Sequence, residues 1–187
     1  MKKITLAILL LTFISGIITP SLSLAARKSE IDRDVKTGLQ TLYDSNEMAK
    51  ILSEKAKGIL IFPSIIKGGL FFGAQYGDGA LLKGSETLGY YNSVEASYGL
   101  QAGIQKFGYA MFFMTDDALS YLNKSDGWEV GVGPNIVIVD KETAAAFGKN
   151  LSSSTLKDNI YAFVFSQKGL MAGIALQGSK ITKILPE

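Results

Sequence analysis

The 187-residue sequence contains no cysteine and no histidine. Their absence excludes disulfide bonds, lipid attachment through a cleavage-site cysteine and the common Cys/His zinc sites. Ser-His-Asp and Cys-His catalytic arrangements are excluded for the same reason. No serine–lysine pair stands out either, so we expect neither an enzyme nor a bound cofactor. An enzyme acting on lipid or cell-wall material remains an alternative without recognisable machinery.

A transmembrane-length apolar run is also missing. The uncharged run from Ile4 to Ile18 is shorter than the ~20 residues that a membrane-spanning helix needs. It follows the basic start MKK and precedes the small residues SLSLAA, a pattern typical of a secretory signal peptide. We therefore predict a signal peptide over residues 1–26, cleaved after Ala25 or Ala26. An uncleaved membrane anchor is the alternative.

The remaining residues, 27–187, are long enough for one domain with a sizeable core. Cleavage would remove Lys2 and Lys3 and no acidic residue, which leaves 17 basic and 17 acidic side chains. Proteins that bind phosphate backbones usually show a basic excess, so we expect no nucleic-acid partner. The signal peptide predicts an exported protein of the periplasm or cell envelope, or one that is secreted.

Two helices are predicted at the start of this domain. In the first, Ile31, Val35, Leu39 and Leu42 follow helical spacing, and Ser29 stands where an N-cap is expected. The second begins near Ser45, with Met48, Ile51 and Leu52 facing inward, and ends before Gly58.

After Gly58 the pattern changes to short apolar segments separated by turn signals, which is typical of strands. The pair Asp78-Gly79 predicts a tight hairpin. One helix is expected to begin at Thr115, with Asp116 and Asp117 favoured by its N-terminal dipole rather than binding a metal ion. A short helix over 141–147 is a further expectation. The predicted strands are Gly58–Pro63, a segment from Leu70, Gly89–Val94, Tyr98–Gln105, Tyr109–Met114, Ile136–Val139, Ile160–Ser166 and Leu170–Leu176.

Glycines are frequent within the apolar segments, and a Gly-Leu-x-x-Gly frame occurs at 69–73, 99–103 and 169–173. Because alternate strand residues share a face, such a strand has one apolar face and one nearly bare face. We interpret the glycines as bends of a strongly curved sheet, with closure into a small barrel as an alternative. A groove that admits a ligand against bare backbone is the functional alternative. The expected fold is α+β, with N-terminal helices on a curved, mainly antiparallel sheet.

Three segments resemble the SYLF domain family: AKGILIFPSIIKGGLFFGAQYGDGALL, SYGLQAGIQKFGYAMFFMTDDAL and FSQKGLMAGIALQGSKI. Trp128-Glu129-Val130-Gly131 also resembles a Trp-Glu-Leu-Gly segment of that family. The resemblance spans residues 31–184. It implies a lipid-binding module found in bacterial exported proteins and in eukaryotic proteins of the membrane and actin machinery. For the family it implies binding to phosphoinositides or other anionic lipids, and actin binding in some eukaryotic members.

From the resemblance and the positions of basic residues we predict a peripheral module that binds anionic phospholipid at a membrane surface. The predicted lipid-binding residues lie near the N-terminal helices and are Lys50, Lys55, Lys57 and Lys67. Near an anionic surface each lysine contributes about 1 kcal/mol. An envelope scaffold that binds a protein partner, without lipid binding of its own, is the alternative.

Overall fold

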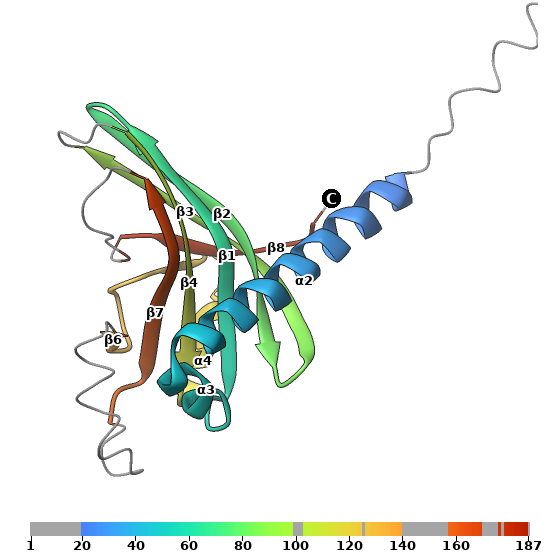
Figure 1. The fold of residues 1–187 in the computed structure, drawn as a ribbon, viewed down its shortest axis with the longest axis vertical. Helices are drawn as coiled ribbons and strands as arrows, with labels where there is room; N and C mark the ends of the chain where they lie inside the picture. Colours follow the sequence, from blue (N-terminus) through green and yellow to red (C-terminus); the bar gives the residue numbers. More distant parts are fainter. Residues whose placement is uncertain are drawn as a thin grey trace, which may run out of the picture.

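The computed structural model describes residues 20–98, 103–124, 126–139, 157–169, 176 and 178–186. Among these residues two helices come first, and most of the remaining elements are strands (Figure 1). The elements are α2 (Pro20–Ser45), α3 (Glu47–Ser53), β1 (Gly58–Gly69), β2 (Phe72–Lys83), β3 (Glu86–Tyr98), β4 (Gly103–Phe113), α4 (Asp116–Ser120), the 3-10 turn η1 (Tyr121–Asn123), β5 (Trp128–Glu129), β6 (Ile136–Val139), β7 (Ile160–Gly169) and β8 (Lys180–Ile184).

The strands form one eight-stranded sheet in the order β5-β8-β3-β2-β1-β4-β7-β6. Every pair is antiparallel except β6 and β7, which are parallel. The sheet curls into a half-barrel (Figure 1). The predicted α+β fold is thus confirmed, whereas closure into a barrel is not seen among the described strands, because β5 and β6 form two separate edges.

The outer face of the sheet packs against the N-terminal helices. Val35 and Leu42 of α2 and Leu52 of α3 are buried against alternate residues of the central strands, such as Ile61 and Phe112. The predicted inward positions Ile31, Val35 and Leu42 of the first helix are confirmed as buried. Burying one such side chain fully contributes about 1.5–3 kcal/mol, so this apolar contact fixes α2 on the sheet.

The inner face holds a second apolar core. Leu60, Phe62 and Tyr109 point inward, and α4, η1 and Trp128 cover them. The Trp128 ring lies 5.9 Å from that of Phe113, and its indole N–H donates to the Val132 carbonyl at 2.9 Å. A buried apolar face and a covering layer therefore exist on both sides of the strands.

The curvature of the sheet requires glycine at Gly77 on the inner face of β2. A Cβ there would lie 2.5 Å from both Ile65 Cδ1 and the Ser64 carbonyl oxygen. Ser64 and Ile65 belong to a β-bulge in β1, where the register to β4 shifts between Phe62 and Ile65. The interpretation of glycines as bends of a curved sheet holds at this position.

Several predicted boundaries are wrong. Ser29 is not an N-cap, because α2 begins at Pro20 and runs through it. Asp78-Gly79 is not a hairpin turn but lies within β2; the chain turns instead at Gly84-Ser85, where Gly84 has φ of 60°. Strand propensity and continued pairing with β1 and β3 outweigh the local turn signal.

The remaining predictions concern the helix caps and three later segments. The Thr115 cap is confirmed, since its hydroxyl accepts from the Ala118 N–H at 3.2 Å. The second helix, predicted to begin near Ser45, begins at Glu47 and is capped by Asn46. The predicted strand 98–105 is wrong in extent, because β3 ends at Tyr98 and β4 begins at Gly103. The predicted helix 141–147 and most of the strand 170–176 lie outside the described residues.

Candidate functional site: an exposed apolar hairpin flanked by lysines

Large apolar side chains are exposed around the turn between β1 and β2. Phe72 is 76% exposed, and Leu70 and Phe71 are 61% and 57% exposed. We call this group and its exposed apolar neighbours the tip surface; it comprises Ile66, Leu70, Phe71, Phe72, Tyr76, Val94 and Ile104. Contiguous exposed apolar groups of this kind mark interaction sites on soluble proteins.

Strand alternation places this surface on the outer face. Ile66 is opposite Tyr76 on one side and Lys106 on the other, and Tyr76 is opposite Val94. Directly opposite residues of an antiparallel pair share a face. The same outer face is covered by α2 further along the strands, but α2 crosses the sheet diagonally and leaves the β1–β2 turn uncovered (Figure 1).

Ile66, Tyr76 and Val94 lie directly opposite one another and form a row across the outer face, which we call the outer row. Lysines extend the outer row on both sides. Lys106 lies beside Ile66, and Lys168 of β7 lies beside Lys106. On the other side, Lys180 of β8 lies beside Val94. All three lysines are exposed. The outer row thus combines a central apolar stretch with cations at both ends.

A bulge in β7 sets the position of Lys168. Between Gly108 and Lys106 of β4, the partner strand steps from Phe165 to Lys168 and so contains one extra residue. Ser166 within it has φ of 53°, a left-handed conformation that a non-glycine residue rarely adopts. The bulge keeps both Phe165 and Lys168 on the outer face, the first under α2 and the second beside Lys106.

The acidic side chains that the structure describes near this row are already engaged. Glu129 of β5 is opposite Lys180. Asp78 accepts from the Arg27 guanidinium at 2.9 Å and from the Tyr76 hydroxyl at 2.7 Å. The hydrogen bond to Asp78 and its negative charge raise the pKa of Arg27, so this contact stays charged and ties α2 to β2. No acidic side chain of the described residues lies opposite Lys106 or Lys168, so these two are the least compensated described cations in the row.

Lys67, a predicted lipid-binding residue, is buried. Its ammonium donates to Glu95 Oε1 at 2.9 Å, and the two side chains are 6% and 8% exposed. It faces the inner side, since it is next to the outer-face residue Ile66. Contact with a membrane surface would require breaking a buried ion pair, which is strongly unfavourable.

The structure places Lys50, Lys55 and Lys57 together on or just after α3, where all three are exposed. Lys57 Nζ lies 3.9 Å from Asp116 Oδ2. These three lysines lie before the first residue of β1, whereas the turn of the tip surface follows its last residue. The length of β1 therefore separates the two groups by roughly 35 Å, at ~3.3 Å per strand residue. A role of these three lysines in lipid binding stays a prediction.

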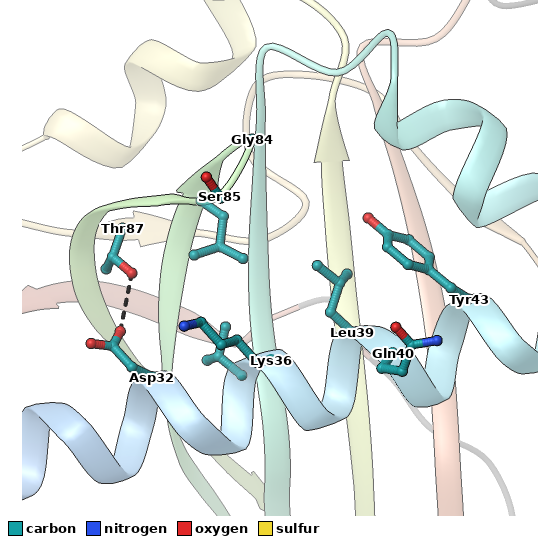
Figure 2. A pocket seen from close by; sticks show the side chains of 10 residues that line it. Asp32, Lys36, Leu39, Gln40, Tyr43, Gly84, Ser85 and Thr87 are labelled. Atoms are coloured by element: carbon teal, nitrogen blue, oxygen red, sulfur yellow. Dashed lines mark hydrogen bonds between the residues drawn. The ribbon is translucent and has the colours of Figure 1, made fainter.

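A hollow of about 280 Å³ lies between α2 and the β2–β3 turn. Figure 2 shows Lys36, Leu39 and Tyr43 of α2 beside it, with Thr87 donating to Asp32 Oδ1 at 3.0 Å. Tyr90 donates to the other carboxylate oxygen, also at 3.0 Å. The volume is just under the ~300 Å³ of small ligand pockets, and Asp32 is already paired. This hollow is a weaker candidate than the tip surface.

The described residues contain no group of three or more carboxylates placed to hold a metal ion. Among the described residues, none of the helices has the length and apolar character needed to cross a bilayer.

A comparison with protein families agrees with the segments quoted above. The family model described as Ysc84, Las17-binding protein actin regulator, matches residues 94–184. This part of the chain belongs to the SYLF family. The match contains the second and third SYLF-like segments, whereas the first, which includes the β1–β2 hairpin, precedes it. A search of curated proteins finds no significant match.

The sequence pattern did not predict the tip surface. It predicts a strand from Leu70, although Leu70-Phe71-Phe72 lies between Gly68-Gly69 and Gly73. Glycines on both sides of three bulky apolar residues indicate a turn with exposed apolar side chains, and this signal could have located the surface. The positions of Lys106 and Lys168 in the same row depend on strand register and a bulge, which the SYLF-like segments do not reveal.

Proposed function

We propose that this SYLF protein is a peripheral module that binds anionic membrane surfaces through the tip surface, without catalysis. The observation that carries the proposal is the exposed Leu70-Phe71-Phe72 turn beside an outer-face row that ends in lysines. Apolar side chains in the head-group region and cations at its boundary are the two components of interfacial binding.

The expected energies are sufficient for reversible binding. Full burial of a large apolar side chain contributes about 1.5–3 kcal/mol, so insertion of the three turn residues to half that depth contributes roughly 2–4 kcal/mol. Lys106 and Lys168 add about 1 kcal/mol each near an anionic surface. The second contribution is screened by salt and the first is not.

Vesicle co-sedimentation tests the proposal with phosphatidylcholine alone and with about 30% phosphatidylglycerol, over a range of salt. Replacing Leu70, Phe71 and Phe72 by serine should weaken binding at least tenfold, because about 1.4 kcal/mol corresponds to a factor of ten. Lys106→Glu with Lys168→Glu should weaken binding to the anionic vesicles by about 30-fold or more and remove most of its salt dependence.

The matched control reverses two lysines at the other end of the sheet, Lys50→Glu with Lys55→Glu. We expect it to bind within about twofold of the unchanged chain. If this control loses binding while the tip variants keep it, the lysines near α3 carry the function instead. Binding to no vesicle at all would reject the membrane role and leave a protein partner as the ligand of the tip surface.

A further inference from the structure

A row of buried polar side chains crosses the inner face of the sheet, one residue from the outer row described above. Glu95, Gln75, Lys67 and Gln105 are directly opposite one another on β3, β2, β1 and β4. Ser179, just before β8, lies at the end of this row. We call these five residues the inner polar row; each is at most 8% exposed.

Hydrogen bonds within the row satisfy only part of its capacity. Lys67 donates to Glu95, the Gln75 amide donates to the Ser179 hydroxyl at 3.2 Å, and that hydroxyl is 3.5 Å from the other Glu95 oxygen. Within the part of the chain that the structure describes, Gln75 Oε1 and both amide atoms of Gln105 have no hydrogen-bond partner. Gln105 is 0% exposed, so its amide is withdrawn from solvent and unpaired.

Such an arrangement is costly for a domain. Each buried donor or acceptor without a partner costs about 1–3 kcal/mol, and native proteins contain few of them. Methionine has a similar volume to glutamine and would pack equally well in an apolar site, without an amide that needs hydrogen-bond partners. Two glutamines on either side of Lys67 therefore point to a group that is bound there and completes their hydrogen bonds.

The unsatisfied atoms define the chemistry of this group. The row offers two carbonyl acceptors and one amide donor, and its single cation and single anion neutralise each other. A neutral group that both donates and accepts matches this set, and hydroxyl groups do both. A lone anion or cation is disfavoured because the row carries no net charge.

We propose that the inner polar row binds a polyol, either free or as the hydroxylated head group of a lipid. The row lies at the same end of the sheet as the tip surface. Between the inner polar row and the β1–β2 turn, the inner faces of β1, β2, β3 and β4 carry only Ser97, Gly73, Gly69 and Gly103. No side chain of these strands larger than serine separates the row from the turn.

The test compares the unchanged protein with Gln105→Met, which keeps the volume and removes the unpaired amide. Gln40→Met, at an exposed position of α2, is the matched control. Glycerol is the free polyol, and its effect on thermal unfolding is measured for all three proteins. The lipid source is tested with vesicles of phosphatidylglycerol against phosphatidylmethanol, which has the same charge and no head-group hydroxyl.

The expected result is a rise in Tm with glycerol that is larger for the unchanged protein and Gln40→Met than for Gln105→Met, because excluded osmolytes raise the Tm of all three. For the lipid source, we expect about tenfold tighter binding to phosphatidylglycerol than to phosphatidylmethanol, a preference that Gln105→Met abolishes and Gln40→Met retains. A difference in the glycerol effect alone assigns the free polyol, and a difference in the vesicle effect alone assigns the lipid head group. Without any probe, Gln105→Met should leave stability unchanged or raise it. If all three proteins respond alike to glycerol and to both lipids, the row binds no polyol. The glycerol measurement does not depend on membrane binding, so failure of this inference and failure of the proposed function are separable.

Discussion

At the scale of residues, Lys67 and Glu95 form the main electrostatic contact inside the sheet. They belong to β1 and β3, with β2 and its Gln75 between them. A buried ion pair gains little over an apolar replacement, but removal of one partner leaves an uncompensated charge in a poorly solvated site. The two types of variant therefore have different expected costs.

We expect Lys67→Met alone to lower the free energy of unfolding by about 3–5 kcal/mol, because Glu95 is left buried without its cation. The double variant Lys67→Met with Glu95→Gln should recover most of that loss. Urea unfolding of both variants and of Glu95→Gln completes the cycle. Equal destabilisation by the single and double variants would show that the pair is not coupled.

Residue types alone could not have separated Lys67 from Lys50 or Lys55. All three are lysines in or beside apolar segments, and the sequence predicts them as one basic group. Burial of Lys67 depends on Glu95, which is 28 positions away and comes opposite it only through the pairing of three strands. Lys50 and Lys55, by contrast, are exposed on α3 and just after its end.

At the scale of elements, the β1–β2 hairpin combines a bulge, a bend and an exposed turn. The bend is close-packed at Gly77, where the bulge residues of β1 occupy the space that a side chain would need. Gly68 lies on the outer face of the same hairpin. A Cβ there would meet only Ile104 Cγ1 at 3.7 Å and the Gly103 carbonyl oxygen at 3.8 Å among the described residues. Two glycines of one hairpin thus differ in whether a side chain would fit.

Gly77→Ala should lower the free energy of unfolding by about 1–3 kcal/mol, because the methyl group overlaps the bulge backbone. Gly68→Ala, the matched control, should be neutral or stabilise the protein by up to about 1 kcal/mol. Thermal or urea unfolding measures both. A neutral Gly77→Ala variant would mean that the sheet relaxes around the added methyl group and that the bend does not depend on glycine.

Sequence patterns predicted the elements better than their limits. The apolar spacing of α2 and the Thr115 cap are local signals. The spacing correctly predicts that Ile31, Val35 and Leu42 are buried, and the Thr115 cap is confirmed. The Asp78-Gly79 turn failed because pairing on both sides of β2 outweighs a two-residue preference. The short strands β5 and β8 were missed, since each depends on a partner that is distant in sequence.

At the scale of the whole molecule, the two ends of the sheet differ in character. The α3 end carries exposed lysines together with Glu47, Glu54 and Asp116, whereas the turn between β1 and β2 is apolar with cations beside it. The proposed function therefore predicts an orientation, with the β1–β2 turn toward the membrane and α3 away from it.

The absence of cysteine allows this orientation to be measured directly. A single cysteine at Phe72 or at Lys55 can carry an environment-sensitive fluorophore. On addition of anionic vesicles, we expect a blue shift of emission for the label in place of Phe72 and no shift for that in place of Lys55. Blue shifts at both positions would contradict a docked orientation in which only the tip surface enters the interface.

The overall fold was predictable because helices precede strands along the chain and the glycine-rich segments indicate curvature. The tip surface and the inner polar row were not, because each is assembled across four or more strands. A shift of one residue in the register of β1 would move Lys67 outward and Ile66 inward. Register of this kind is not visible in the spacing of any one segment.

The edges of the sheet have a consequence for behaviour at high concentration. Among the described strands, the two edge strands are also the shortest, with two residues in β5 and four in β6. Short edges offer few unpaired backbone groups to another chain, and so they limit aggregation by strand addition. Strand addition at β5 and β6 is therefore disfavoured, whereas the exposed apolar turn between β1 and β2 stays accessible to a binding partner.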